Sequence, residues 1–159
     1  MMGEKAMMSI NVNSRSQALE TDGHDTLLTV LRDELGITSP KRGCNQGVCG
    51  SCTVMIDGTP QRSCITLSAS CENKQVHTLD FYKDDPTMQA LQNQFYNCGA
   101  VQCGFCTAGL LISAYALLKD NPAPNLEDVQ NALSGNICRC TGYRKIVDGV
   151  IAASKELSS

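Results

Sequence analysis

Residues 43–54 read Gly-Cys-Asn-Gln-Gly-Val-Cys-Gly-Ser-Cys-Thr-Val, and this stretch of the 159-residue chain decides how its first half folds. Its cysteines, Cys44, Cys49 and Cys52, follow the spacing C-x4-C-x2-C. Three thiolates converge from one short loop only if the chain bends tightly. The glycines around them permit such bends and let backbone N–H groups approach the sulfurs. The stretch therefore predicts a loop that wraps a metal centre.

A fourth cysteine extends this set. Cys64 completes the pattern C-x4-C-x2-C-x11-C and stands at the end of an expected hairpin. The first three cysteines have the spacing of plant-type ferredoxins, in which such cysteines bind an iron-sulfur cluster. A zinc site or a group of buried structural thiols is the alternative, but zinc sites usually take paired C-x2-C units. We therefore predict an iron-sulfur cluster on these four cysteines.

The segments on either side of the loop predict an α+β domain over residues 1–84. Short strands are expected at residues 8–12, 18–20, 53–56, 59–63 and 75–79. Asp57-Gly58 marks a two-residue hairpin turn between two of these strands. A helix with four leucines on one face is expected to begin after Thr26 and to end at Gly36.

The pattern changes to a helical period over residues 85–159. Apolar side chains recur at helical spacing in four segments, which begin near residues 86, 107, 125 and 143. Asp85 before a proline predicts a capped start for the first helix. Asn125 and Asp128 predict a capping box for the third helix, and Leu126 is expected to face inward. Because the joints are short, the four segments predict an antiparallel helical bundle.

A second set of cysteines falls in this helical half. Cys103 and Cys106 form C-x2-C between the first and second expected helices, and Cys138 and Cys140 form C-x-C between the third and fourth. In an up-down-up-down bundle these two joints lie at the same end, so the four thiolates can meet. Such pairs suit zinc about as well as an iron-sulfur cluster. The first cluster favours a second one, because two nearby redox centres form an electron path.

Two of the ten cysteines remain. Cys71 has no partner pattern and is expected to be an ordinary buried thiol. Cys98 begins a second C-x4-C-x2-C run and is therefore an alternative ligand for the second centre. Arg139, between the last two cysteines of that centre, either tunes the cluster or is a solvated or interfacial salt-bridge residue.

Composition and charge narrow the functional classes. The chain is 42% hydrophobic and 18% charged, so it is neither disordered nor collagen-like. A net charge of -3 leaves no basic face for phosphates, so no nucleic-acid partner is expected. The longest apolar stretch, residues 108–118, is too short to span a membrane, and residues 1–8 lack the features of a secretory signal. We therefore expect a cytoplasmic protein, without a membrane partner, whose clustered cysteines bind metal.

Three motifs resemble one known family. Residues 43–54, residues 102–107 (Gln-Cys-Gly-Phe-Cys-Thr) and residues 135–143 (Gly-Asn-Ile-Cys-Arg-Cys-Thr-Gly-Tyr) are similar to the small iron-sulfur subunit of the molybdenum hydroxylases, the xanthine dehydrogenase and aldehyde oxidoreductase family. The resemblance covers nearly the whole chain. It implies a β-grasp 2Fe-2S ferredoxin domain followed by an all-α four-helix-bundle 2Fe-2S domain. The implied ligands are Cys44, Cys49, Cys52 and Cys64 for the first cluster and Cys103, Cys106, Cys138 and Cys140 for the second.

The resemblance also implies partners and an electron path. A large molybdopterin-binding subunit, which carries molybdenum, oxidises the substrate, and a medium FAD-binding subunit receives the electrons. We expect a dimer of such heterotrimers. In this family the helical-domain cluster lies next to the pterin and the ferredoxin-type cluster nearer the flavin. Gln102 matches a position that contacts the pterin, and a cap or loop hydrogen bond is its alternative role. No substrate chemistry is expected on this chain.

The substrate and a competing function stay open at this point. Residues 62–67 and 106–109 look somewhat like family members that hydroxylate N-heteroaromatic compounds. Purines, aldehydes, carbon monoxide and acyl-CoA thioesters are the other substrate classes of the family. The alternative function is a free-standing ferredoxin-type electron carrier with a metal-bound helical module. The mild charge of the chain argues against it, because many soluble ferredoxins are strongly acidic for transient docking.

Overall fold

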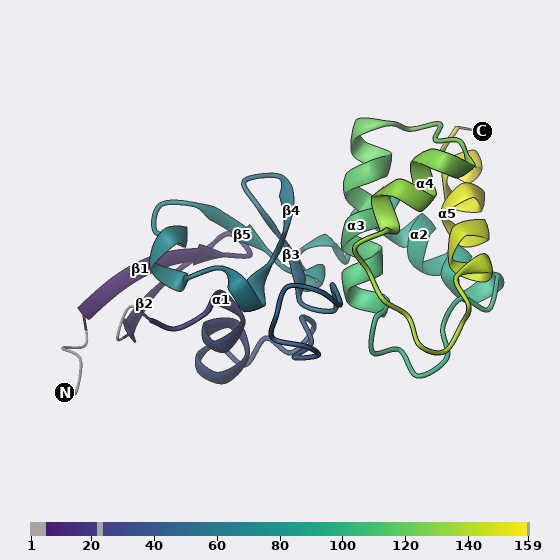
Figure 1. Ribbon diagram of the computed structural model, residues 1–159. Helices are drawn as coiled ribbons and strands as arrows, with labels where there is room; N and C mark the ends of the chain where they lie inside the picture. Colours follow the sequence, from purple (N-terminus) through teal and green to yellow (C-terminus); the bar gives the residue numbers. More distant parts are fainter. Residues whose placement is uncertain (1–5, 22–23, 159) are drawn as a thin grey trace.

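The computed structural model describes residues 6–21 and 24–158 and shows a sheet-containing half beside a helical half (Figure 1). The N-terminal half contains a five-stranded mixed sheet in the order β2-β1-β5-β3-β4. Its strands are β1 (Ala6–Val12), β2 (Arg15–Thr21), β3 (Thr53–Ile56), β4 (Thr59–Arg62) and β5 (Gln75–His77). The prediction that strands and a helix make up the first half is therefore confirmed.

Strand pairing explains where the expected boundaries shift. β1 pairs antiparallel with β2 and parallel with β5, and β3 lies antiparallel between β5 and β4. The hairpins turn through Asn13-Ser14 and Asp57-Gly58, all four with positive φ, as a twisted two-residue turn requires. The strand predicted at residues 18–20 is longer, because β2 pairs with β1 along its whole length. The strand predicted at residues 75–79 is shorter, because the chain turns into a 3-10 helix after Thr78.

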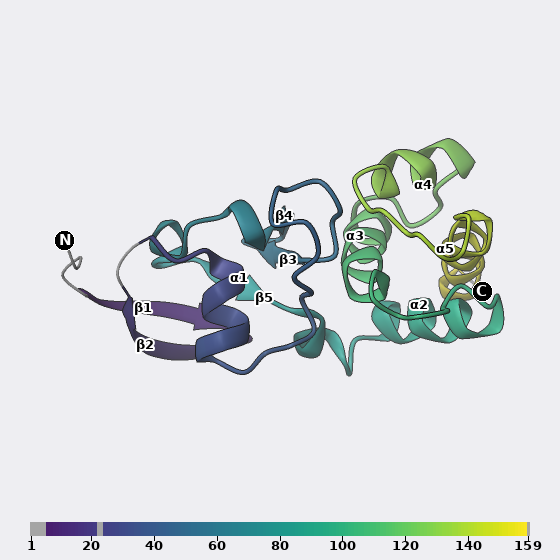
Figure 2. The same cartoon turned by 60° about the horizontal axis from the view of Figure 1, so that its bottom comes forward.

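A short helix covers one face of this sheet (Figure 2). It consists of α1 (Leu27–Thr29) and a π-helical turn over Val30–Glu34, and Thr26 caps it by accepting a hydrogen bond from Thr29 N at 3.2 Å. Leu27 and Leu31 of this helix are fully buried in the core of the sheet half. The core they join is formed by Met8, Ile10, Val12, Leu27, Leu31, Val54, Ile56, Cys71 and Val76. Short 3-10 turns follow at Ser63–Ile65, Ser68–Cys71 and Leu79–Tyr82.

Four helices form the C-terminal half. They are α2 (Pro86–Asn97), α3 (Thr107–Asp120), α4 (Leu126–Leu133) and α5 (Arg144–Leu157). The capped start of α2 is confirmed, because Asp85 accepts hydrogen bonds from the backbone of Thr87 and Met88. The capping box of Asn125 and Asp128 on α4 is confirmed as well. The prediction for Leu126 is wrong: its side chain is 54% exposed, because it lines an open cleft with Tyr143 and Val147 and does not enter the core.

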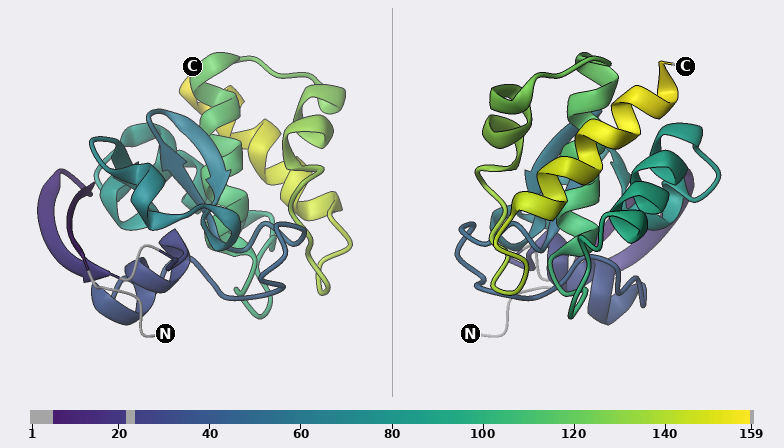
Figure 3. Two further views of the ribbon diagram at one scale, coloured as in Figure 1. Left: turned by 60° about the vertical axis from the view of Figure 1, so that its left-hand side comes forward. Right: turned by 90° about the vertical axis from the view of Figure 1, so that its right-hand side faces the viewer.

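The two halves share packing through α3. This helix packs against α2 and α4 and also against β3 and β4. In the right-hand view of Figure 3, α2 and α5 lie in front of α3 and the sheet lies behind it. Met55 of β3 belongs to the same apolar core as the four helices, so the halves are not separated by solvent. Within the described part of the chain, no helix combines the length and apolar character needed to cross a membrane.

Candidate metal centres

The loop between α1 and β3 brings Cys44 and Cys49 together. The backbone N–H groups of Cys49 and Gln46 both donate to Cys44 Sγ, each at 3.3 Å. These hydrogen bonds lower the pKa of Cys44 to about 6, so its thiolate forms near neutral pH. A loop that donates N–H groups to sulfur favours the charged form that binds iron.

Cys52 and Cys64 form a second, buried pair beside the first. Cys52 is 2% exposed at the start of β3, and Cys64 is 6% exposed in the turn after β4. Burial and the neighbouring thiols of Cys52 and Cys44 together raise the pKa of Cys64 to about 11. The four cysteines predicted for the first centre therefore lie together, as two pairs.

Two glycines keep space open in this loop. A Cβ atom on Gly43 would lie 2.7 Å from the Cys49 sulfur. Gly47 has a φ of +75°, and a Cβ there would lie 2.7 Å from Ile65 Cδ1. Side chains at these positions would therefore intrude on the Cys49 sulfur or on Ile65.

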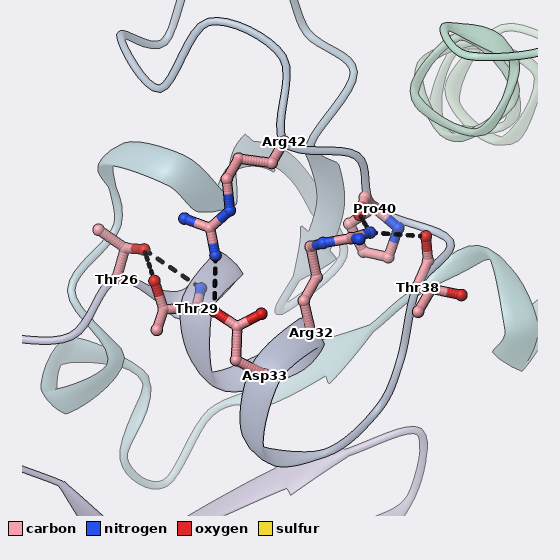
Figure 4. A network of polar contacts seen from close by, with 7 residues as sticks. All are labelled: Thr26, Thr29, Arg32, Asp33, Thr38, Pro40 and Arg42. Atoms are coloured by element: carbon pink, nitrogen blue, oxygen red, sulfur yellow. Dashed lines mark hydrogen bonds and ion pairs between the residues drawn. The ribbon is translucent and has the colours of Figure 1, made fainter.

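A polar network anchors the segment that leads into this loop (Figure 4). Arg32 donates to the carbonyl oxygens of Thr38 at 3.0 Å and Pro40 at 2.8 Å. Arg42 forms an ion pair with Asp33 at 2.8 Å. These contacts fasten the chain before Cys44 to the helical turn, so the start of the loop has a defined position.

The second set of cysteines meets at one end of the helices. Cys103 and Cys106 precede α3, Cys138 and Cys140 precede α5, and both joints lie at the lower end of the helical half in Figure 1. The sulfur atoms of Cys103 and Cys140 lie 3.5 Å apart, and both residues are exposed. The two joints therefore share one end of the helical half, as expected from the sequence.

Cys106 and Cys138 form the inner pair of this second set. Burial and the neighbouring Cys138 thiol together raise the pKa of Cys106 to about 12. Burial also acts against ionisation of Cys138, but the hydroxyl of Thr141 donates to its sulfur at 3.0 Å, so its pKa is lowered. Thr141 was not singled out from the sequence, although its place three residues after a ligand is the signal that could have found it.

The paired arrangement fits a two-iron cluster. In both sets, two thiols lie together and the second two lie beside them. A 2Fe-2S cluster takes four cysteine thiolates, two on each iron. Within residues 6–21 and 24–158, no three or more His, Cys, Asp or Glu side chains surround a single metal-ion position. The donor type and number at each centre match what two such clusters need.

The other residues considered from the sequence are not members of these pairs. Cys71 is fully buried in the core of the sheet half, and burial raises its pKa. Cys98 is half-buried at the end of α2, and none of the pKa shifts of the second set involves it. Gln102 is exposed next to Cys103, and Arg139 is exposed between the last two cysteines.

A small cleft of about 180 Å³ lies where the two centres approach each other. Its walls include Cys49 from the first set and all four cysteines of the second. The backbone N–H of Ile137 donates to the carbonyl oxygen of Cys49 at 2.9 Å, which joins a residue of one centre to the neighbour of Cys138 in the other. The geometry therefore supports two adjacent redox centres in direct backbone contact.

Known proteins show the same combination. The family model described as 2Fe-2S iron-sulfur cluster binding domain matches residues 10–95, and the one described as [2Fe-2S] binding domain matches residues 78–151. The chain is 42% identical to the nicotine 6-hydroxylase small subunit of Paenarthrobacter nicotinovorans, over 98% of this chain and 94% of that one. It is also 42% identical to the nicotinate dehydrogenase small FeS subunit of Eubacterium barkeri, over 89% and 90%.

A solved structure extends this similarity to three dimensions. A chain of quinoline 2-oxidoreductase from Pseudomonas putida 86 superposes with a TM-score of 0.90 at 39% identity, over 98% of this chain and 97% of that one. Because the relatives match along their whole length, the similarity is not confined to one cysteine motif. The chain therefore belongs to the small iron-sulfur subunits of the molybdenum hydroxylase family, with two 2Fe-2S binding domains.

Proposed function

We propose that this chain carries electrons from a molybdopterin centre on a large subunit, through its two 2Fe-2S clusters, to FAD on a medium subunit. The observation that carries the proposal is the presence of two four-cysteine centres in backbone contact. The chain itself performs no substrate chemistry in this scheme. Each cluster accepts one electron and passes it on, so the protein supplies ligands, spacing and insulation from water.

The pairing of thiols supports a ligand assignment for each iron. In the first cluster, Cys44 and Cys49 bind one iron and Cys52 and Cys64 bind the other. In the second, the two pairs that bind one iron each are Cys103 with Cys140 and Cys106 with Cys138. This assignment leaves Cys71 and Cys98 without a role as ligands.

The exposed surfaces near the clusters support the order of electron flow. Cys103 and Cys140 are exposed beside Gln102, within an apolar rim formed by Val101, Phe105 and Ile137. An apolar rim around a redox centre suits a permanent interface from which water is excluded. We assign this face to the molybdopterin subunit, with Gln102 and Cys140 nearest the pterin.

A second exposed apolar group lies near the first cluster. Val48, Ile65 and Leu67 are each more than half exposed. Ile65 lies against Gly47 of the cysteine loop. We assign this face to the flavin subunit. Electrons then enter at the helical half and leave at the sheet half.

The finer fold description belongs to the same proposal. The mixed sheet crossed by a helix is what a β-grasp ferredoxin domain over residues 1–84 would have, and α2 to α5 are the helices of a four-helix bundle over residues 85–159. We place the whole assembly in the cytoplasm as a dimer of heterotrimers. A free-standing electron carrier is not favoured, because the relatives are named as small subunits of dehydrogenases and hydroxylases.

The names of the relatives also favour a substrate class. Nicotine, nicotinate and quinoline all appear in them, and all three are N-heteroaromatic compounds. We propose that the large subunit hydroxylates a compound of this class. The choice among such compounds depends on the large subunit and not on residues of this chain.

Purification of the complex from its native host tests the proposal. We expect about four iron atoms per chain, since two 2Fe-2S clusters hold two irons each. Molybdenum and flavin should elute together with this chain. An isolated chain with two irons and no molybdenum would contradict the proposal and would support the free-standing carrier.

A further inference from the structure

Glycines allow the two cysteine loops to touch directly. Gly50 lies between Cys49 and Cys52 and has a φ of +71°, and a Cβ there would lie 2.5 Å from the carbonyl oxygen of Gly135. On the facing helix, a Cβ on Gly109 would overlap the carbonyl oxygen of Gly50. The backbones of the two loops therefore approach as closely as atoms allow, and any side chain here would separate the halves.

Three hydrogen bonds cross this contact. Besides the bond from Ile137 N to Cys49, the side-chain amide of Asn136 donates to the Gly50 carbonyl at 3.2 Å. The Arg62 guanidinium donates to the Gly135 carbonyl at 2.5 Å. Each bond joins the segment around one set of cysteines to the segment just before Cys138 in the other.

Asn136 is the buried member of this contact. It is 2% exposed, and its Oδ1 accepts a hydrogen bond from the Ser113 hydroxyl of α3 at 2.8 Å. Its amide group therefore has a partner on both sides: α3 orients the oxygen, and the nitrogen holds the loop of the first centre. A buried amide held by hydrogen bonds at both its oxygen and its nitrogen has a fixed orientation, and its loss leaves the partner groups unpaired.

We infer that Asn136 is a positioning residue that sets the separation and relative orientation of the two clusters, and thereby the rate of electron transfer between them. The inference rests on the proposed ligands, because Asn136 stands two residues before Cys138 and holds the residue after Cys49. Electron tunnelling slows exponentially with distance, so a small displacement of one loop has a large effect on rate. A site held by a rigid supporting contact keeps that distance constant.

The test compares Asn136→Ala with the unchanged chain, both as full-length protein with clusters assembled. Iron content and the two separate cluster signals in electron paramagnetic resonance are measured first. In the fully reduced state each cluster is paramagnetic, so the magnetic splitting between them reports their separation and orientation. We expect Asn136→Ala to keep both clusters, to change or broaden this splitting, and to slow electron equilibration between clusters severalfold after rapid photoreduction.

Ser113→Ala serves as the second variant, because it removes the bond that orients Asn136 without changing either loop. We expect a smaller change in the same direction. Asn131→Ala is the control, because Asn131 is exposed on α4. The magnetic splitting and the rate of electron equilibration in this variant should equal those of the unchanged chain.

Normal splitting and rate in Asn136→Ala would overturn the inference. If that variant assembles no second cluster, Ser113→Ala decides, and unchanged splitting there overturns the inference. Absence of two cluster signals in the unchanged chain would instead contradict the proposed function, so the two failures are distinguishable.

Discussion

The two cysteine centres are built in different ways. Three cysteines of the first centre come from one loop within residues 44–52, and the fourth follows a single hairpin later. The second centre takes one pair of cysteines from the joint before α3 and the other from the joint before α5. The helices α3 and α4 therefore lie between the two pairs in sequence. The first is therefore a local feature of the chain, and the second exists only when the helices pack.

This contrast has a physical cause. A short loop loses less conformational entropy on closing than a long one, so the first three cysteines are near one another before the rest of the domain folds. Closing the second centre requires α3 and α4 to pack first, because these helices separate its two pairs. The second centre should therefore depend more strongly on distant contacts than the first does.

The largest expected effect comes from removing one ligand at each centre. Cys52→Ser should lose the first cluster and Cys138→Ser the second, each reducing iron from about four atoms per chain to about two. Iron analysis and electron paramagnetic resonance would show which signal disappears. If Cys52→Ser removed both signals, assembly of the second centre would depend on the first, and the two would not be independent.

A glycine substitution measures how much the contact between the halves contributes. Gly50→Ala should destabilise the chain by more than the roughly 1–2 kcal/mol that a left-handed conformation costs a residue with a side chain, because its Cβ also meets Gly135. Gly58→Ala is the matched control, with a φ of +80° but nothing within 4 Å. Denaturant unfolding compares them, and equal losses would mean that the close approach is unimportant.

Acid should weaken the helical half through Asp85. Burial alone would raise its pKa, but hydrogen bonds from Tyr115 and the α2 backbone, together with Lys119, lower it below 3.8. Asp85 therefore contributes stability above this pH, and the contribution is lost as the pH falls through the lowered pKa. Asp85→Asn should cost about 1 kcal/mol at pH 7 and progressively less as the pH falls through the lowered pKa.

Urea unfolding of both chains at each pH measures that difference. The control is Asp84→Asn, because Asp84 is 86% exposed beside Lys83 and should show no such pH dependence. A difference for Asp85→Asn that stayed constant down to pH 2 would contradict the role of its charge.

The smallest expected effect concerns Cys98, the alternative ligand for the second centre. Cys98→Ser should leave iron content and both cluster signals unchanged, because this residue is not part of either pair of the second set. Loss of one cluster in this variant would show that Cys98 replaces Cys138 or Cys140. The second centre would then take one of its cysteines from the end of α2.

Much of the fold follows from local chemistry and could be predicted. The caps at Asp85 and Asn125 and the turn at Asp57-Gly58 depend on side chains that bond their own neighbouring backbone. The inward orientation expected for Leu126 was wrong, because helical periodicity does not say where the neighbouring helices end. The assignment of the eight cysteines to two clusters stays a prediction until the ligands are tested.

Patterns and motifs along the chain were enough to identify two four-cysteine sets, short strands with a helix in the first half, the four later helices and the family. They could not reveal that the two sets touch through Gly50, Gly109 and Asn136. Those contacts join residues brought together only by packing of α3 between the halves. Cysteine spacing records local loop geometry, whereas the distance between two centres depends on how separate elements pack.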